Sequence, residues 1–232
     1  FISVLCFAVN NTVFAQPNSV ELQDGGGSLL SSHSSIEEAY NAIPAVFTQA
    51  YIIEILAAYT GANEVFPIDL TSKSGHSAVN TITIRPDAGN SGEVITSANT
   101  SGTINIHRTD YLIIDGRPGG VGTVPDLEIR NTSTGSNAFA VLLDSGATFC
   151  VIKYIKSYAN SNGTTGGRNI EIGPSPNIPG GTSNNIVDNC YVNGGRTAIG
   201  IDGGTAPSGN PAVNNIISNC TIENFGFNAI WL

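Results

Sequence analysis

Charged residues are scarce in this sequence, and basic residues are the scarcest among them. Only 12% of the 232 residues are charged, and 9 Lys and Arg stand against 18 Asp and Glu, for a net charge of −9. Nucleic acids and anionic membranes are bound through clustered basic side chains. We therefore expect neither as a partner, because the few Lys and Arg residues are scattered along the chain.

Methionine and metal-binding cysteine motifs are also absent. The chain contains no Met, even at position 1, and it ends at Leu232 inside a strand-like pattern. We therefore expect a fragment that is truncated at both ends. The four cysteines form no Cys-x-x-Cys motif and no Cys/His spacing typical of a metal site. We predict no metal ligands, and we interpret His33, His76 and His107 as loop or coil residues.

Glycine and asparagine are abundant instead. The 27 Gly and 25 Asn residues tolerate left-handed backbone conformations and close tight turns. Together with frequent Val, Ile and Thr, this composition favours many short strands joined by many turns.

A repeat organises the second half of the chain. Residues 185–194 recur thirty positions later as residues 215–224, and a looser third copy aligns Phe149 with Ile186 and Ile155 with Val192. A second ladder has spacings of 29, 29 and 31 residues and consists of the pairs Val141/Leu143, Ile170/Ile172, Ile199/Ile201 and Ile230/Leu232. Apolar alternation at a fixed period predicts an all-β solenoid, a parallel β-helix.

Asparagine and cysteine recur within this repeat. We interpret the asparagines at positions 184/214, 185/215 and 189/219 as amide ladders at corners between strands, where each amide bonds to the copies above and below it. Cys190 and Cys220 share one repeat position, so we expect their side chains to stack inward on adjacent coils. Stacked strands lie ~4.8 Å apart and constrain the sulfur geometry, which favours two thiols over a disulfide without excluding the latter.

The chain divides into three segments. Residues 1–15 resemble the end of a signal peptide cut before Gln16, which predicts a secreted or cell-surface protein; the alternative is an apolar first strand. The apolar run of residues 1–9 is much shorter than the ~20 residues that span a membrane. Residues 16–33 are polar and glycine-rich, as in a linker. Residues 34–232 form the predicted β-helix domain.

One short helix is expected at the start of this domain. Ser34 and Glu37 have the spacing of a capping box, and the apolar residues that follow them lie on one helical face. A lone amphipathic helix before a stack of strands predicts a cap that covers the open end of the core.

Three strand patterns together resemble a known family. Residues 82–86, residues 111–117 and the repeat at residues 184–190 are similar to right-handed parallel β-helix proteins exported by Bacteroidetes, which have a pectate-lyase-like fold. The resemblance covers residues 34–232 and implies a secreted or surface location, often with a type IX secretion sorting domain. Some relatives are polysaccharide lyases or glycoside hydrolases, and many have no established activity. The resemblance allows Ca²⁺ as a cofactor, although no ligand set in the sequence supports it.

The second ladder also predicts a candidate site. If its isoleucines point inward, strand alternation turns Glu171 and Trp231 outward, with Leu142 and Gly200 in the same row. Asp144 and Asp202 follow directly after their strands, where ordinary turns are the alternative explanation. Trp stacks on sugar rings, and carboxylates bind hydroxyls or act as acid and base. We therefore take Trp231, Glu171, Asp144 and Asp202 as candidate substrate-binding residues, and Glu171 and Asp202 as candidate catalytic residues.

The sequence leaves two functions open. Lys153, Lys156, Arg168 and Arg196 are the basic residues available to a lyase, but Arg168 and Arg196 are out of register with each other. A paired-Asp motif for hydrolysis is also missing. We therefore expect a non-catalytic scaffold that binds or displays polysaccharide within a larger exported protein. The alternative is a fragment of a polysaccharide lyase or glycoside hydrolase that acts on the outer face of the β-helix.

Overall fold

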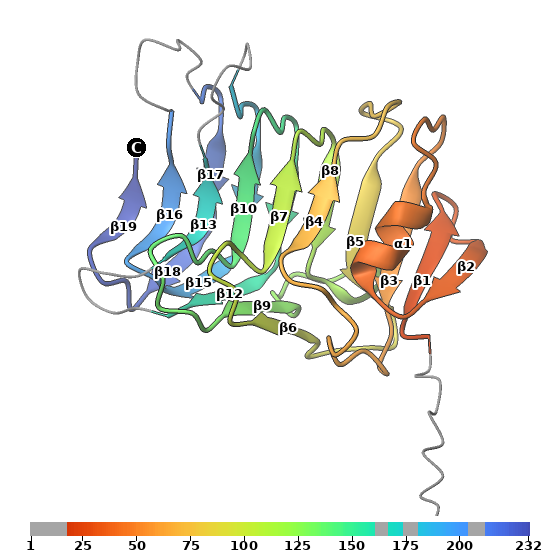
Figure 1. Cartoon of the computed structure of the whole chain (residues 1–232), viewed down its shortest axis with the longest axis horizontal. Helices are drawn as coiled ribbons and strands as arrows, with labels where there is room; N and C mark the ends of the chain where they lie inside the picture. The colour runs from red at the N-terminus through yellow and green to blue at the C-terminus, as the bar shows by residue number, and fades with distance from the viewer. Residues whose placement is uncertain (1–17, 161–166, 174–180, 204–211) are drawn as a thin grey trace, which may run out of the picture.

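The chain winds into a β-solenoid whose strands stack along one axis (Figure 1). The computed structural model describes residues 18–160, 167–173, 181–203 and 212–232. The signal-like segment of residues 1–15 lies outside the described residues. This arrangement confirms the prediction of an all-β parallel solenoid.

Within the described residues, the strands form sheets of eight, six and five strands. The first sheet has the order β17 (Ile216–Ser218), β14 (Ile186–Asp188), β11 (Val151–Lys153), β8 (Leu112–Asp115), β5 (Ile82–Pro86), β3 (Tyr51–Ile55), β1 (Val20–Asp24) and β2 (Leu29–His33). The second has the order β19 (Asn228–Trp231), β16 (Thr197–Ile201), β13 (Arg168–Ile172), β10 (Val141–Asp144), β7 (Ile104–His107) and β4 (Ile68–Thr71). The third has the order β18 (Thr221–Glu223), β15 (Tyr191–Gly194), β12 (Lys156–Ala159), β9 (Glu128–Asn131) and β6 (Val94–Ser97).

The apolar ladder predicted from the sequence is the inner face of the second sheet. Val141 pairs with Ile170, Ile170 with Ile199, and Ile199 with Ile230. The same ladder continues towards the N-terminus through Ile104 and Ile68. All of these residues except Ile230 are fully buried. Burial of this stripe from coil to coil contributes to the hydrophobic core that all three sheets share.

The third copy of the repeat is shifted from its predicted alignment. Val151, not Phe149, pairs with Ile186, and Ser157, not Ile155, pairs with Val192. Phe149 instead lies at a corner with a positive φ of 56°, where it cannot extend a strand. The sequence alignment was wrong here because it matched apolar residues across a corner.

Residues 20–33 form a β-hairpin, so the prediction of a linker over residues 16–33 was wrong. β1 pairs antiparallel with β2 on one side and with β3 on the other. Asp24 accepts hydrogen bonds from the backbone N–H groups of Gly26 and Ser28, each at 2.9 Å, and so closes the hairpin turn. The glycines mark this turn, and buried Val20 and Leu22 anchor the hairpin in the core.

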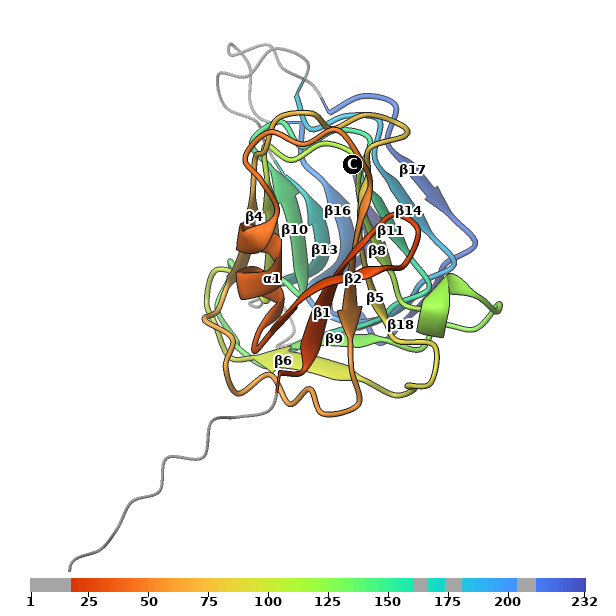
Figure 2. The ribbon, with the colours of Figure 1, turned by 90° about the vertical axis from the view of Figure 1, so that its right-hand side faces the viewer.

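The predicted helix is present as α1 (Ile36–Ala42), with its cap shifted by one residue. Ser35, not Ser34, is the N-cap and accepts a hydrogen bond from Glu38 N, while the Glu38 carboxylate accepts one from Ser34 N at 2.9 Å. Ser35 and Glu38 therefore cap the helix in a variant of the capping box, in which the carboxylate binds the N–H of Ser34 instead of that of the N-cap residue. α1 packs against β1, β2, β3 and β4 at one end of the stack, which faces the viewer in Figure 2. Among the described residues, no helix is both long and apolar enough to cross a membrane.

The recurring asparagines lie at corners, as predicted, but they bond differently from the predicted ladder. Asn184, Asn189, Asn214 and Asn219 all have a positive φ of 52–60°, a conformation that Asn tolerates. Among the described residues, the Asn214 side-chain amide donates to Asn184 Oδ1 at 3.2 Å, and Asn215 Oδ1 accepts from the backbone N–H of Asn185 at 2.9 Å. The buried Asn185 side chain bonds to backbone: its Oδ1 accepts from Cys150 N and its Nδ2 donates to Ala147 O.

We expect Asn185→Ala to lower the free energy of unfolding by about 1–3 kcal/mol, because the Cys150 N–H and the Ala147 carbonyl would lose their buried partner. Asn160→Ala is the matched control, since the Asn160 amide is exposed where it donates to Thr132 O. Urea denaturation of both variants measures the difference. Equal destabilisation would contradict a structural role specific to the buried amide.

Candidate functional site

The predicted row of residues exists on the outer face of the second sheet. Backbone pairing aligns six residues, which we call the outer row: Asp69, Asn105, Leu142, Glu171, Gly200 and Trp231. Asp144 lies two residues after Leu142, at the end of β10, and Asp202 lies two residues after Gly200, just past the end of β16. The order of residues in the row is the predicted one, but their exposure differs from the prediction.

Glu171 is buried, although the register turns it outward. Its side chain is only 1% exposed and forms an ion pair with Arg168. Gly200 leaves the space that the carboxyl group fills, since a Cβ at that position would collide with Glu171. Burial raises the pKa of Glu171, the Arg168 guanidinium opposes this and Asp202 adds to it, so that the pKa is raised to about 7. Glu171 therefore faces outward as predicted but is covered, and its role as a binding or catalytic residue stays a prediction.

Arg168 connects the remaining predicted residues. Its guanidinium lies 3.7 Å from the Asp202 carboxylate, and its central carbon lies 4.3 Å from the centre of the partly exposed Trp231 ring. Glu171, Asp202 and Trp231 are thus brought together around one guanidinium, which screens the Glu171 carboxylate from solvent. Arg196 instead stacks on Phe227 at 5.2 Å, so the two arginines contact different groups.

Asp144 belongs to a second cluster on the same face. Its carboxylate bonds to His107 Nδ1, and His107 Nε2 lies 3.4 Å from Asp69 Oδ1. A Cβ at Gly173 would lie 3.6 Å from both Asp144 Cβ and Glu171 Cγ, so the two clusters adjoin. His107 ends β7 and pairs with Asp144, which corrects its interpretation as a loop or coil residue. The alternation of apolar and polar residues over 104–107 is the sequence feature that could have placed His107 in a strand.

No metal site emerges from these carboxylates. Across the described ranges, no group of three or more His, Cys, Asp or Glu side chains is placed to hold a metal ion. His107 and Arg168 already occupy positions next to the carboxylates, where a cation would have to bind. The observed residues therefore do not fit a Ca²⁺ site on this face.

The third sheet carries a hollow that the sequence did not indicate. Its volume is about 280 Å³ and it is lined by Arg130, Asn131, Thr132, Tyr158, Ala159, Asn160 and Asn193, which we call the Tyr158 hollow. Arg130, Tyr158 and Asn193 are neighbours in register on three adjacent strands. One feature of the sequence could have pointed to this hollow: Tyr158 and Asn193 occupy equivalent outward positions in successive repeats.

Polar and aromatic groups alternate around this hollow. The Arg130 guanidinium lies 4.7 Å from the Tyr158 ring centre and bonds to Glu128. Asn193 Nδ2 donates to the Tyr191 hydroxyl at 2.8 Å, and the Tyr191 ring centre lies 5.9 Å from that of Tyr158. These contacts hold an aromatic ring beside amide and guanidinium groups on a rigid sheet.

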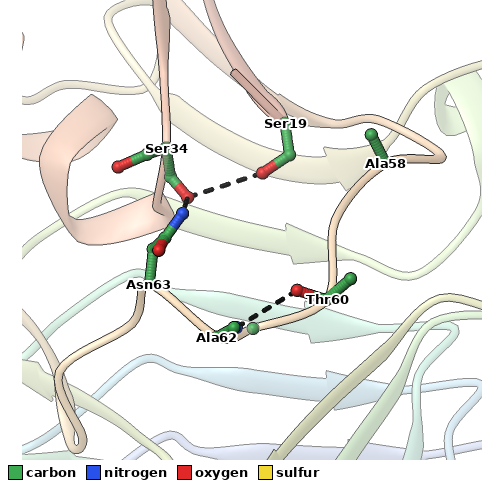
Figure 3. A pocket seen from close by; sticks show the side chains of 7 residues that line it. Ser19, Ser34, Ala58, Thr60, Ala62 and Asn63 are labelled. Carbon is green, nitrogen blue, oxygen red and sulfur yellow. Dashed lines mark hydrogen bonds between the residues drawn. The ribbon is translucent and has the colours of Figure 1, made fainter. Parts of the chain in front are cut away.

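A smaller pocket of about 130 Å³ lies near the N-terminal hairpin (Figure 3). Ser19 Oγ and Asn63 Nδ2 each donate to the Ser34 carbonyl at 3.4 Å across it. Its lining residues are all small or uncharged: Ser19, Ser34, Ala58, Thr60, Gly61, Ala62 and Asn63. With neither an aromatic ring nor a charge in its lining, this pocket is a weaker candidate than the Tyr158 hollow.

Comparison with known proteins assigns no relative. No family model, no curated protein and no solved structure matches the chain. The function must therefore be inferred from the surfaces described above.

The His107 cluster predicts a pH-dependent contribution to stability. Hydrogen bonding to Asp144 raises the pKa of His107 above 6.5 in the folded state. The resulting stabilisation is complete below the unfolded pKa and is lost as the pH rises through the folded pKa. In urea unfolding between about pH 5.5 and 9, the stability difference between wild type and His107→Gln should therefore shrink as the pH rises. A difference that stays constant with pH would contradict this assignment.

Proposed function

We propose that this chain is part of an exported right-handed β-helix protein, related to the pectate-lyase-like proteins of Bacteroidetes. It acts as a non-catalytic scaffold that binds or displays polysaccharide. The observation that carries this proposal is the Tyr158 hollow, which offers a ring surface and hydrogen-bonding groups on a stiff sheet.

General rules support the handedness and the cap. About 98% of crossover connections between parallel strands of one sheet are right-handed, because of the intrinsic twist of the strands. α1 packs against the first strands of the solenoid, where an uncovered core would expose apolar side chains and unpaired backbone. We therefore assign α1 as the N-terminal cap of a right-handed solenoid.

The N-terminal sequence supports export. Residues 1–9 are apolar except for Ser3, and a cut between Ala15 and Gln16 would leave β1, which begins at Val20, intact. N-terminal sequencing of the exported protein tests this, with Gln16 as the expected first residue.

The chemistry of the Tyr158 hollow suits a sugar. The Tyr158 ring offers apolar surface, and the amides of Asn160 and Asn193 each carry donor and acceptor atoms that match vicinal hydroxyls. A volume of about 280 Å³ is close to the lower end of ligand pockets, which start near ~300 Å³. The hollow therefore fits one or a few sugar units, and neighbouring coils extend the surface along a polymer.

Binding to a panel of neutral and acidic polysaccharides tests the scaffold function. We expect Tyr158→Ala to weaken binding roughly tenfold, about 1.4 kcal/mol, because an aromatic ring at the centre of the contact is lost. Trp231→Ala is the matched variant on the second sheet. Weaker binding in Trp231→Ala alone would move the contact to the outer row, and binding unaffected by either change would refute both sites.

A second candidate function is glycoside hydrolysis. The observation that favours it is the pKa of about 7 for Glu171 beside Asp202, since a general acid needs a raised pKa. The Arg168 ion pair would have to open to admit substrate. In the same panel, new reducing ends that disappear in Glu171→Gln would establish a hydrolase, and unsaturated products would establish a lyase. We expect neither, because the Glu171 carboxyl group is buried.

A further inference from the structure

Cys190 and Cys220 occupy equivalent positions on adjacent coils. Each residue lies between a strand of the first sheet and a strand of the third, and the flanking strands pair in register. The Thr221 N–H donates to the Cys190 carbonyl at 2.9 Å, which ties the two corners directly together. Parallel neighbours of this kind place their Cα atoms ~4.8 Å apart, within the ~4.4–6.8 Å range of disulfides.

The two side chains also point the same way. Cys190 is buried, and Cys220 is partly buried and packs against the same core. Each sulfur lies close to the carbonyl two residues before it, at 3.3 Å from Asp188 O and 3.2 Å from Ser218 O. The thiols are therefore neighbours with parallel orientations, as the sequence predicted.

Their surroundings make the two thiols unequal. Burial raises the pKa of Cys190, whereas the neighbouring Cys190 thiol lowers the pKa of Cys220. Cys220 is also the more exposed of the two. The thiolate is the nucleophile in thiol–disulfide exchange, so Cys220 has the properties of an attacking thiol.

The third described cysteine provides an internal comparison. Cys150 is fully buried, and burial raises its pKa to about 12. It lies in a different part of the repeat, where its N–H bonds to Asn185. Cys150 therefore lacks both a thiol neighbour at its repeat position and access to solvent.

We propose that Cys190 and Cys220 are a dithiol that closes to a disulfide, with Cys220 attacking and Cys190 resolving. The oxidant is a small-molecule disulfide. The Cys220 thiolate attacks one sulfur of that disulfide, forms a mixed disulfide and expels one thiolate, which takes up a proton. Cys190 then loses its proton and attacks the Cys220 sulfur, which releases the second small thiol. Two protein thiols are oxidised, and one small disulfide is reduced to two thiols.

The bond would join two coils that otherwise meet only through hydrogen bonds and packing. It closes a segment of about thirty residues that contains β15, β16 and β17. The oxidised chain would therefore resist opening of the coil that carries β17 and β18. This inference does not depend on the proposed binding of polysaccharide.

The test is to incubate the full chain with oxidised glutathione, alkylate the remaining thiols and map the peptides by mass spectrometry. We expect a Cys190–Cys220 linked peptide with a mass two hydrogens lower than the two thiol peptides. Cys190→Ser should instead accumulate a glutathione adduct on Cys220, and Cys150→Ser should behave as wild type. A persistent adduct on wild-type Cys220, a link that includes Cys150, or no link at all would each overturn the proposal.

The pH dependence of alkylation provides a check that needs no variant. The rate of iodoacetamide labelling at Cys220 should reach half its maximum at a pH below the ~8.5 of an ordinary thiol, because the neighbouring Cys190 lowers the pKa of Cys220. Labelling that rises only above this ordinary value would remove Cys220 as the attacking thiol.

Discussion

Register between successive coils is the constraint on which the rest of this structure depends. Backbone hydrogen bonds hold each strand directly over the equivalent strand of the previous coil, as in the series Val141, Ile170 and Ile199. Any position in one coil therefore lies one strand spacing from the equivalent position of the next coil. Inward positions must be apolar or satisfied by backbone, and corner positions must accept a positive φ. Only outward positions remain open to function.

This constraint explains which parts of the fold the sequence could predict. Apolar alternation at a period near thirty residues identified the inner ladder of β10, β13 and β16, because burial demands it in every coil. The coils are not equal in length, however, since Ile104 pairs with Val141 across 37 residues. The apolar alternation of residues 104–106 predicts a strand, but the period did not place it in this ladder or reveal the contact between His107 and Asp144. The N-terminal hairpin was missed because its glycine-rich turn has the composition of a linker.

The candidate site was predictable in position but not in exposure. The register predicted from the sequence places Glu171 on the outer face of the second sheet, and the structure confirms this position. Its burial depends on the length of Arg168, the ring of Trp231 and the missing side chain of Gly200, which lie on different strands and act together. The Tyr158 hollow is likewise formed by three strands, and no single repeat contains it. A buried position or a hollow that depends on side chains of several coils is difficult to predict, because those residues are far apart in the sequence.

The direction of the interstrand hydrogen bonds also determines how the solenoid responds to tension. The strands stack along one axis (Figure 1), and the hydrogen bonds that join neighbouring strands run along it. A pull along that axis therefore loads the coil interfaces in series, and each interface carries the whole force. The weakest interface would then open first, coil by coil. A pull between two corners of one coil instead loads covalent backbone. A protein of this design is therefore mechanically anisotropic, compliant along its length and stiff across it.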